Sequence, residues 1–77
     1  MSMVESVSLI HVRKGQKVRV VRLLPVDESQ LRKLTVFGIL PGVEIEILQK
    51  YPIHVLQVGH TQIALDDDIA KNILVTK

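Results

Sequence analysis

The sequence predicts a small, mainly β domain: a partly open barrel with one inserted α-helix and a short C-terminal helical turn. Short segments in which apolar and polar residues alternate recur along the chain, as in half-buried strands. One segment, 27–38, changes to a three-residue apolar step, and the chain lacks the repeated crossover helices of a parallel sheet. With 77 residues, the chain suffices for one domain and not for two. We therefore expect a single domain over 1–77, with 1–6 flexible.

The first strands are expected over 7–12 and 17–23, separated by a turn that contains Gly15. In the second strand Val18 and Val20 alternate with basic residues, which is the period of a strand with one face in water. Pro25 ends this strand because proline cannot donate a hydrogen bond to a sheet.

The segment 27–38 predicts a short helix. Asp27 or Ser29 can cap its start by accepting a backbone N–H bond. Gly38 fits the position just past its end, where a left-handed backbone is needed. The apolar stripe of this helix, which we expect to lie against a sheet, consists of Leu31, Leu34 and Phe37.

The next segments predict a turn, a strand and a hairpin. Pro41 and Gly42 suit the central positions of a tight turn, and 43–47 then alternates with an acidic outer face. Within 53–65, Gly59-His60 suits the centre of a II′ turn. That turn pairs Val58 with Thr61, Leu56 with Ile63 and His54 with Leu65.

Three consecutive aspartates follow the hairpin. Asp66 to Asp68 can cap a short helical turn over 69–73, and 74–75 predicts a last strand. The triplet lacks the alternating ligand spacing of a calcium loop, so we assign it to capping.

The composition limits the possible functions. There are no cysteines, which excludes disulfides and thiolate zinc sites. No glycine-rich phosphate loop, nucleophile elbow or other catalytic constellation is present, so we expect no enzyme. No run approaches the roughly 20 apolar residues that span a bilayer, and no secretory signal is visible. We expect a cytoplasmic protein without direct membrane insertion.

Three histidines, His11, His54 and His60, could ligate a transition metal together with Asp66 to Asp68. On the hairpin register, His54 and His60 lie about 20 Å apart along an extended strand. They cannot chelate one ion unless His60 folds back or a second chain contributes. We expect ordinary surface or hairpin histidines and no required cofactor; a site for iron, manganese or zinc at His54 and His60 is the alternative.

Charge and apolar content constrain the partners. The net charge is +2 and the aromatic residues are Phe37 and Tyr51, which is weak support for nucleic-acid binding, and we expect none. The basic residues of 13–22 are expected to form a solvated strand face. Because 47% of the residues are hydrophobic, self-association or a protein partner stays open. The candidate contact residues, which could instead close the core, are Val36, Phe37, Leu40, Tyr51, Ile53 and Val55.

The order of the motifs over 9–75 resembles the FeoA family. In the first part of the family's motif order, the matching residues are Leu9, Gly15, Arg19, Val20 and Leu23. The helix and the turn are met by Leu31, Arg32, Leu34, Gly38, Ile39, Pro41 and Gly42. The last part is met by Gly59, Thr61, Ile63, Ala64, Leu65, Ala70, Ile73 and Val75. The chain departs from the family in the short connection before Pro52 and in Phe37, where a smaller aliphatic residue or leucine is frequent.

The resemblance implies an SH3-like barrel of the prokaryotic cytoplasm associated with ferrous iron uptake. Such proteins are thought to assist FeoB, a membrane permease with a cytoplasmic GTP-binding domain, through protein contact rather than catalysis. A similar barrel forms the C-terminal domain of DtxR-type metal-dependent repressors, so a transition-metal-binding regulatory barrel is the alternative function. The resemblance gives a structural role to Gly38, Pro41, Gly42 and Gly59.

Overall fold

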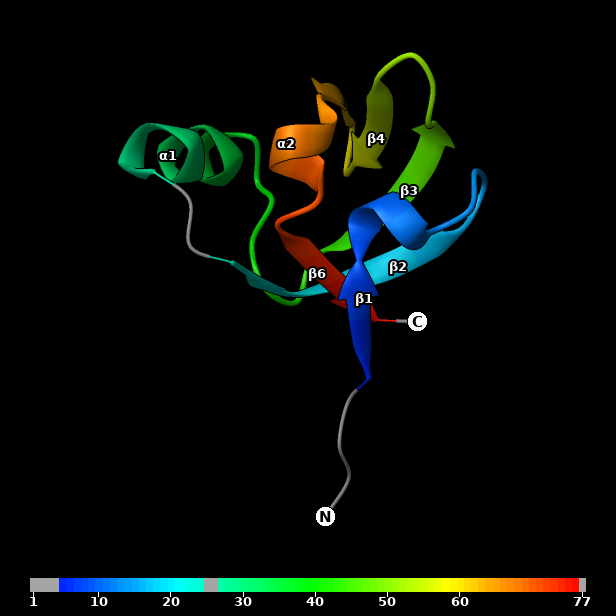
Figure 1. The fold of residues 1–77 in the computed structure, drawn as a ribbon, viewed down its shortest axis with the longest axis horizontal. Coiled ribbons are helices and arrows are strands. Elements are labelled where there is room, and N and C mark those ends of the chain that lie inside the picture. The colour runs from blue at the N-terminus through cyan, green and yellow to red at the C-terminus, as the bar shows by residue number, and fades with distance from the viewer. Residues whose placement is uncertain (1–4, 25–26, 77) are drawn as a thin grey trace.

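The computed structural model describes residues 5–24 and 27–76. Their elements follow one another along the chain as three strands with two helices between them, a hairpin, and a helical turn that leads into a last strand (Figure 1). They are β1 (Ser6–Ser8), the 3₁₀ helix η1 (Leu9–His11), β2 (Lys17–Leu23), α1 (Glu28–Val36), β3 (Glu44–Gln49), β4 (His54–Val58), β5 (Thr61–Leu65), α2 (Asp67–Ala70) and β6 (Ile73–Thr76).

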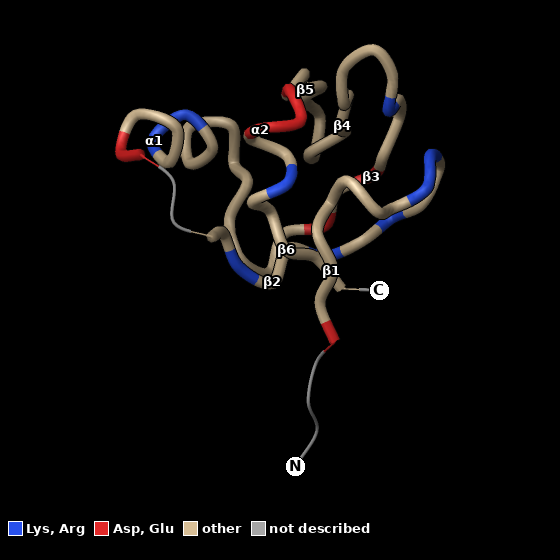
Figure 2. The backbone as a smooth tube through the Cα atoms, viewed as in Figure 1, with Lys and Arg blue, Asp and Glu red and all other residues tan. Residues whose placement is uncertain are grey.

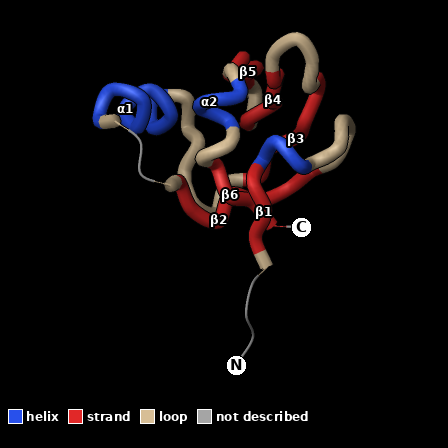
Figure 3. The backbone as a smooth tube through the Cα atoms, in the orientation of Figure 1, coloured by secondary structure: helices blue, strands red, loops and turns tan. Residues whose placement is uncertain are grey.

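The six strands form one antiparallel sheet in the order β1-β6-β2-β3-β4-β5. Strand β2 belongs to both halves of this sheet: its first residues, 17–19, pair with β3, and its last residues, 20–23, pair with β6. The register shifts between Val20 and Arg22, where β2 meets β6. The sheet therefore curves into a small barrel of the SH3-like type, as the sequence predicted, and α1 lies to one side of its strands (Figure 3).

The interior of the barrel is filled almost entirely with aliphatic side chains. Every described strand except β1 contributes buried residues, and η1, α1 and α2 each add one. Burying such side chains is the main stabilising term in a chain without disulfides. The core consists of Leu9, Val12, Val18, Val20, Leu34, Ile39, Ile45, Ile47, Leu56, Val58, Ile63, Leu65, Ala70, Ile73 and Val75.

Helix α1 begins and ends with the capping groups that the sequence predicted. The Asp27 side chain accepts a hydrogen bond of 2.9 Å from the Gln30 N–H. At the other end, the Gly38 N–H bonds to the Thr35 carbonyl and the Ile39 N–H to the Leu34 carbonyl. These two bonds form a Schellman motif, in which Gly38 takes the left-handed conformation at φ 82°.

The expected apolar stripe of α1 is only partly correct. Leu34 is buried, whereas Leu31 and Phe37 on either side of it are exposed. The buried stripe is narrow because α1 meets the barrel mainly at its C-terminal end, where Gly38 approaches Val58 of β4.

The expected first strand over 7–12 is also only partly correct. Strand β1 ends at Ser8, whose Oγ accepts a hydrogen bond from the Ile10 N–H and donates one to the Lys71 carbonyl. The chain turns into η1, which closes with a bond from the Val12 N–H to the Leu9 carbonyl. Serine thus ends the strand as a cap, a local preference that outweighs the apolar alternation.

The hairpin has the register that the sequence predicted. Val58 pairs with Thr61, Leu56 with Ile63 and His54 with Leu65. Gly59 has a φ of 60°, as the first central residue of a II′ turn requires.

The remaining boundaries differ in small ways from the expectations. Asp66 caps α2 by accepting from the Ile69 N–H, but Ile73 begins strand β6 instead of extending the helical turn. Ser6 pairs with Thr76, and residues 1–4 and Pro25 lie outside the described residues. No helix in the described segments has the length and apolar character that crossing a bilayer demands.

We predict that Gly42→Val lowers the free energy of unfolding by about 2 kcal/mol, because a β-branched residue disfavours positive φ. Gly42 has a φ of 92°, and a Cβ there meets no atom within 4 Å. The loss therefore comes from backbone strain and not from a clash. Gly42→Asn, which tolerates this conformation better, should lose less. Equal losses in urea denaturation of the two variants would contradict this explanation.

Candidate functional site

The predicted contact residues fall into two separate groups. The first group lies at the C-terminal end of α1 and in the turn that follows it, and Leu31 of the same helix joins it. All of its members are exposed, Val36 most of all at 76%. We call this set the helix-end surface; it consists of Leu31, Val36, Phe37 and Leu40.

The second group lies at the connection between β3 and β4, well apart from α1 in Figure 1. Tyr51 is 86% exposed, whereas Ile53 and Val55 are each only half-buried. Val55 pairs with Ala64 and Gln49 on the outside of the sheet. The fold therefore divides the predicted contact residues between two separate places on the surface.

The basic residues of the first half are exposed along β2 and the loop before it (Figure 2). Lys17 lies opposite Glu46 and Arg19 lies opposite Glu44 in the β2–β3 pairing. Opposite charges across neighbouring strands partly offset one another, so this face is a mixed, solvated surface and not a continuous basic patch.

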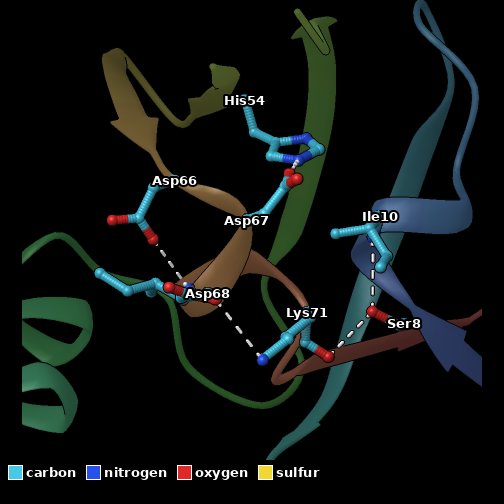
Figure 4. A network of polar contacts seen from close by, with 8 residues as sticks. Ser8, Ile10, His54, Asp66, Asp67, Asp68 and Lys71 are labelled. Atoms are coloured by element: carbon cyan, nitrogen blue, oxygen red, sulfur yellow. Dashed lines mark hydrogen bonds and ion pairs between the residues drawn. The ribbon is translucent and has the colours of Figure 1, made fainter. Parts of the chain in front are cut away.

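A buried histidine meets an aspartate at the start of α2. His54 is 4% exposed, on the face of β4 that also carries Leu56 and Val58. Its Nε2 forms a hydrogen bond with Oδ1 of Asp67 (Figure 4). The side chain of Asp67 lies largely in water. This bond links the hairpin to α2 and gives a partner to the one buried polar side chain among residues 5–24 and 27–76.

The other candidate metal ligands do not join His54. Asp66 uses Oδ1 to cap α2, and Asp68 forms an ion pair of 3.5 Å with Lys71. His60 lies at the exposed end of the hairpin, as its sequence separation from His54 indicated. Among residues 5–24 and 27–76, no group of three or more His, Cys, Asp or Glu side chains could hold a metal ion.

Sequence reasoning missed the burial of His54, although the signal for it was present. The predicted register places residue 54 two and four positions from Leu56 and Val58, hence on their face of the strand. Nothing local could identify Asp67 as its partner, because the contact depends on where α2 packs after the hairpin. His54 is therefore a hairpin histidine, as expected, but a buried one and not a surface residue.

The fold and its surface define a class: a small SH3-like barrel that displays an apolar surface and lacks a visible catalytic or metal cluster among its described residues. The model of the FeoA domain family matches residues 7–77. The chain therefore belongs to the FeoA family, whose members are generally non-catalytic and are linked to ferrous iron transport.

Known structures agree with this assignment. The crystal structure of an iron uptake regulatory protein (FeoA) matches 92% of this chain and 95% of its own, with 27% identity and a TM-score of 0.81. An FeoA-like protein from Clostridium acetobutylicum, solved by NMR, has 32% identity over 95% of this chain and 87% of its own, with a TM-score of 0.80. No curated protein sequence matches the chain.

The same fold occurs inside larger proteins. IdeR from T. acidophilum matches 99% of this chain with a TM-score of 0.90 and 25% identity, but the match covers 36% of the IdeR chain. The similarity is to the C-terminal region of DtxR/IdeR-type repressors. The barrel is thus a module that stands alone in some proteins and is attached to other domains in others.

We predict that Asp67→Ala lowers the free energy of unfolding by about 1 kcal/mol, because it removes the partner of a buried ring nitrogen. Asp68→Ala is the matched control, since Asp68 also lies in the first turn of α2 but makes only an exposed ion pair. Its loss should stay below about 0.5 kcal/mol. Thermal or urea denaturation measures both, and a larger loss for Asp68→Ala would contradict the role given to His54.

Proposed function

We propose that this protein is a non-enzymatic accessory of ferrous iron transport, which acts by contact with the cytoplasmic region of an FeoB-type permease. Membership in the FeoA family supports the link to iron transport. The observation that supports action by contact is the helix-end surface, where four apolar side chains are exposed within ten residues of one another. Contiguous apolar patches are typical of protein interaction sites, and these four exposed residues are close together in the sequence.

The helix-end surface suits a binding role better than the residues near Tyr51. It exposes three aliphatic side chains beside an aromatic one, whereas the aliphatic residues near Tyr51, Ile53 and Val55, are half-buried. Aromatic residues with exposed apolar neighbours are enriched where interfaces are strongest. It is also held rigidly, because Phe37 is the C-cap of α1 and Leu40 begins a hydrogen-bonded turn. A rigid surface loses little conformational entropy on binding, which favours affinity.

A regulatory barrel that binds a transition metal is the alternative function. The contact between His54 and Asp67 supports it, since imidazole and carboxylate are common metal ligands. The fold similarity to metal-dependent repressors supports only a shared barrel and not a metal site in it, because those proteins carry further domains. Two side chains alone make a weak site, so a third ligand would have to come from elsewhere.

We predict that the double variant Val36→Ser/Phe37→Ser binds the cytoplasmic region of the cognate permease at least tenfold more weakly than the natural chain, since it removes two apolar contacts. Both side chains are exposed, so the fold should persist, which circular dichroism checks. Tyr51→Ser, in the other group, is the control and should bind normally. Calorimetry or pull-down in each nucleotide state measures the binding.

Two outcomes would count against this assignment. If the natural chain binds the permease in no nucleotide state, the accessory function itself is wrong. If only Tyr51→Ser loses binding, the accessory function stands but the contact lies at the β3–β4 connection.

We predict that titration with ferrous, manganous or zinc ions gives no saturable heat, because the described residues bring only His54 and Asp67 together. Isothermal calorimetry of the natural chain measures this directly. Saturable binding that disappears in His54→Gln but not in His60→Gln would favour the regulatory alternative and place the metal at the buried histidine.

A further inference from the structure

Strand β5 ends the sheet and leaves one row of backbone groups without a neighbouring strand. In a hairpin with a two-residue loop, the pair beside the loop exchanges both hydrogen bonds, and bonded pairs then alternate along the strands. Thr61, Ile63 and Leu65 therefore bond to β4. The N–H and C=O groups of Gln62 and Ala64 point the other way, toward the outer edge, and pair with no other strand in the described part of the chain.

This edge lacks several of the devices that commonly protect an edge strand. Natural edges are shortened, charged, interrupted by proline or bent by a bulge. Strand β5 has five residues, none of them charged or proline, and its pairing with β4 runs without a shift in register. The opposite edge is different, because β1 has three residues and turns at once into η1. Thr61, Gln62 and Ala64 are exposed, so the strand is open to another chain.

We propose that β5 pairs with β5 of a second copy of this chain, antiparallel and centred on Ile63. The position of the free backbone groups allows this register. Gln62 of one copy then lies opposite Ala64 of the other, and both offer an outward N–H and C=O at the same level. This register also pairs all five residues of each strand with the five of the other. It joins the two sheets into one and goes beyond the proposed contact with a permease.

Polar complementarity supports a second copy as the occupant of this edge, because an imidazole N–H can donate to a carboxylate. In the proposed register, His60 of each copy lies opposite Asp66 of the other. Asp66 keeps an extended backbone, with φ −80° and ψ 170°, so the strand geometry reaches this residue. The remaining pairs are neutral, and no like charges meet. A shift that brings the two Asp66 carboxylates together would place like charges across the strands and lose most of the pairing.

The dimer should be weak. Pairing of two five-residue edges buries less than the roughly 1,200 Å² of a standard stable interface. We therefore expect a dissociation constant on the order of 0.1–1 mM, which sedimentation equilibrium and protein NMR can both reach.

The first test is sedimentation equilibrium of the natural chain and of Ala64→Pro. Proline removes an N–H that only the dimer uses, and exposed edge positions tolerate it. Association should weaken at least tenfold while circular dichroism shows the same fold. Ala64→Val keeps the N–H at the same exposed position and should dimerise like the natural chain. A monomer at every concentration up to 1 mM, or a dimer that Ala64→Pro does not weaken, would overturn the proposal.

The second test separates this register from other ways of pairing. His60→Lys places a cation opposite Asp66 in both symmetric contacts and should tighten the dimer about fivefold. His60→Asp places like charges there and should weaken it by a similar factor. Both changes lie in the exposed turn, so the fold should not change. Equal dissociation constants for the two variants would refute the pairing of His60 with Asp66.

Discussion

The backbone of Val20 holds the two halves of the barrel together. Its N–H bonds to the Val43 carbonyl and its C=O accepts from the Gly42 N–H, while on its other side it pairs with Val75 of β6. The turn after α1, the start of β3 and the last strand thus all meet at one residue. Because its side chain is also buried, Val20 fixes the curvature of β2, and the barrel closes around that strand. The helix and the hairpin are positioned through the same strand.

Local rules account for most of this architecture. The hairpin register follows from the glycine of its turn, and the ends of α1 follow from Asp27 and Gly38, as the sequence predicted. Two deviations have different causes: Ser8 ends β1 as a local cap, whereas α1 buries little besides Leu34 because of where it meets the barrel. In both cases a weak apolar pattern competed with a specific hydrogen bond or with the position of the helix on the barrel.

The functional features were harder to predict because they depend on packing between distant segments. The contact of His54 with Asp67 joins two separate elements. The sequence gives the number of residues between them, but not how they pack against each other in space. The contact residues were predicted as one set, yet the fold divides them between the end of α1 and the β3–β4 connection. Exposure of single residues such as Val36 follows from the helix orientation, which is decided by how Leu34 and Ile39 enter the core. Sequence periodicity alone does not contain that information.

The turn from Gly38 to Gly42 has two roles, and substitution of its two glycines cannot separate them. The two glycines supply the left-handed conformations that lead the chain from α1 into β3. The same segment holds Phe37 and Leu40 in the helix-end surface. A change at Gly38 or Gly42 alters stability and the geometry of that surface together, so loss of binding in such a variant would be ambiguous. Side-chain changes at Val36 and Phe37 leave the backbone intact, which is why they distinguish recognition from folding.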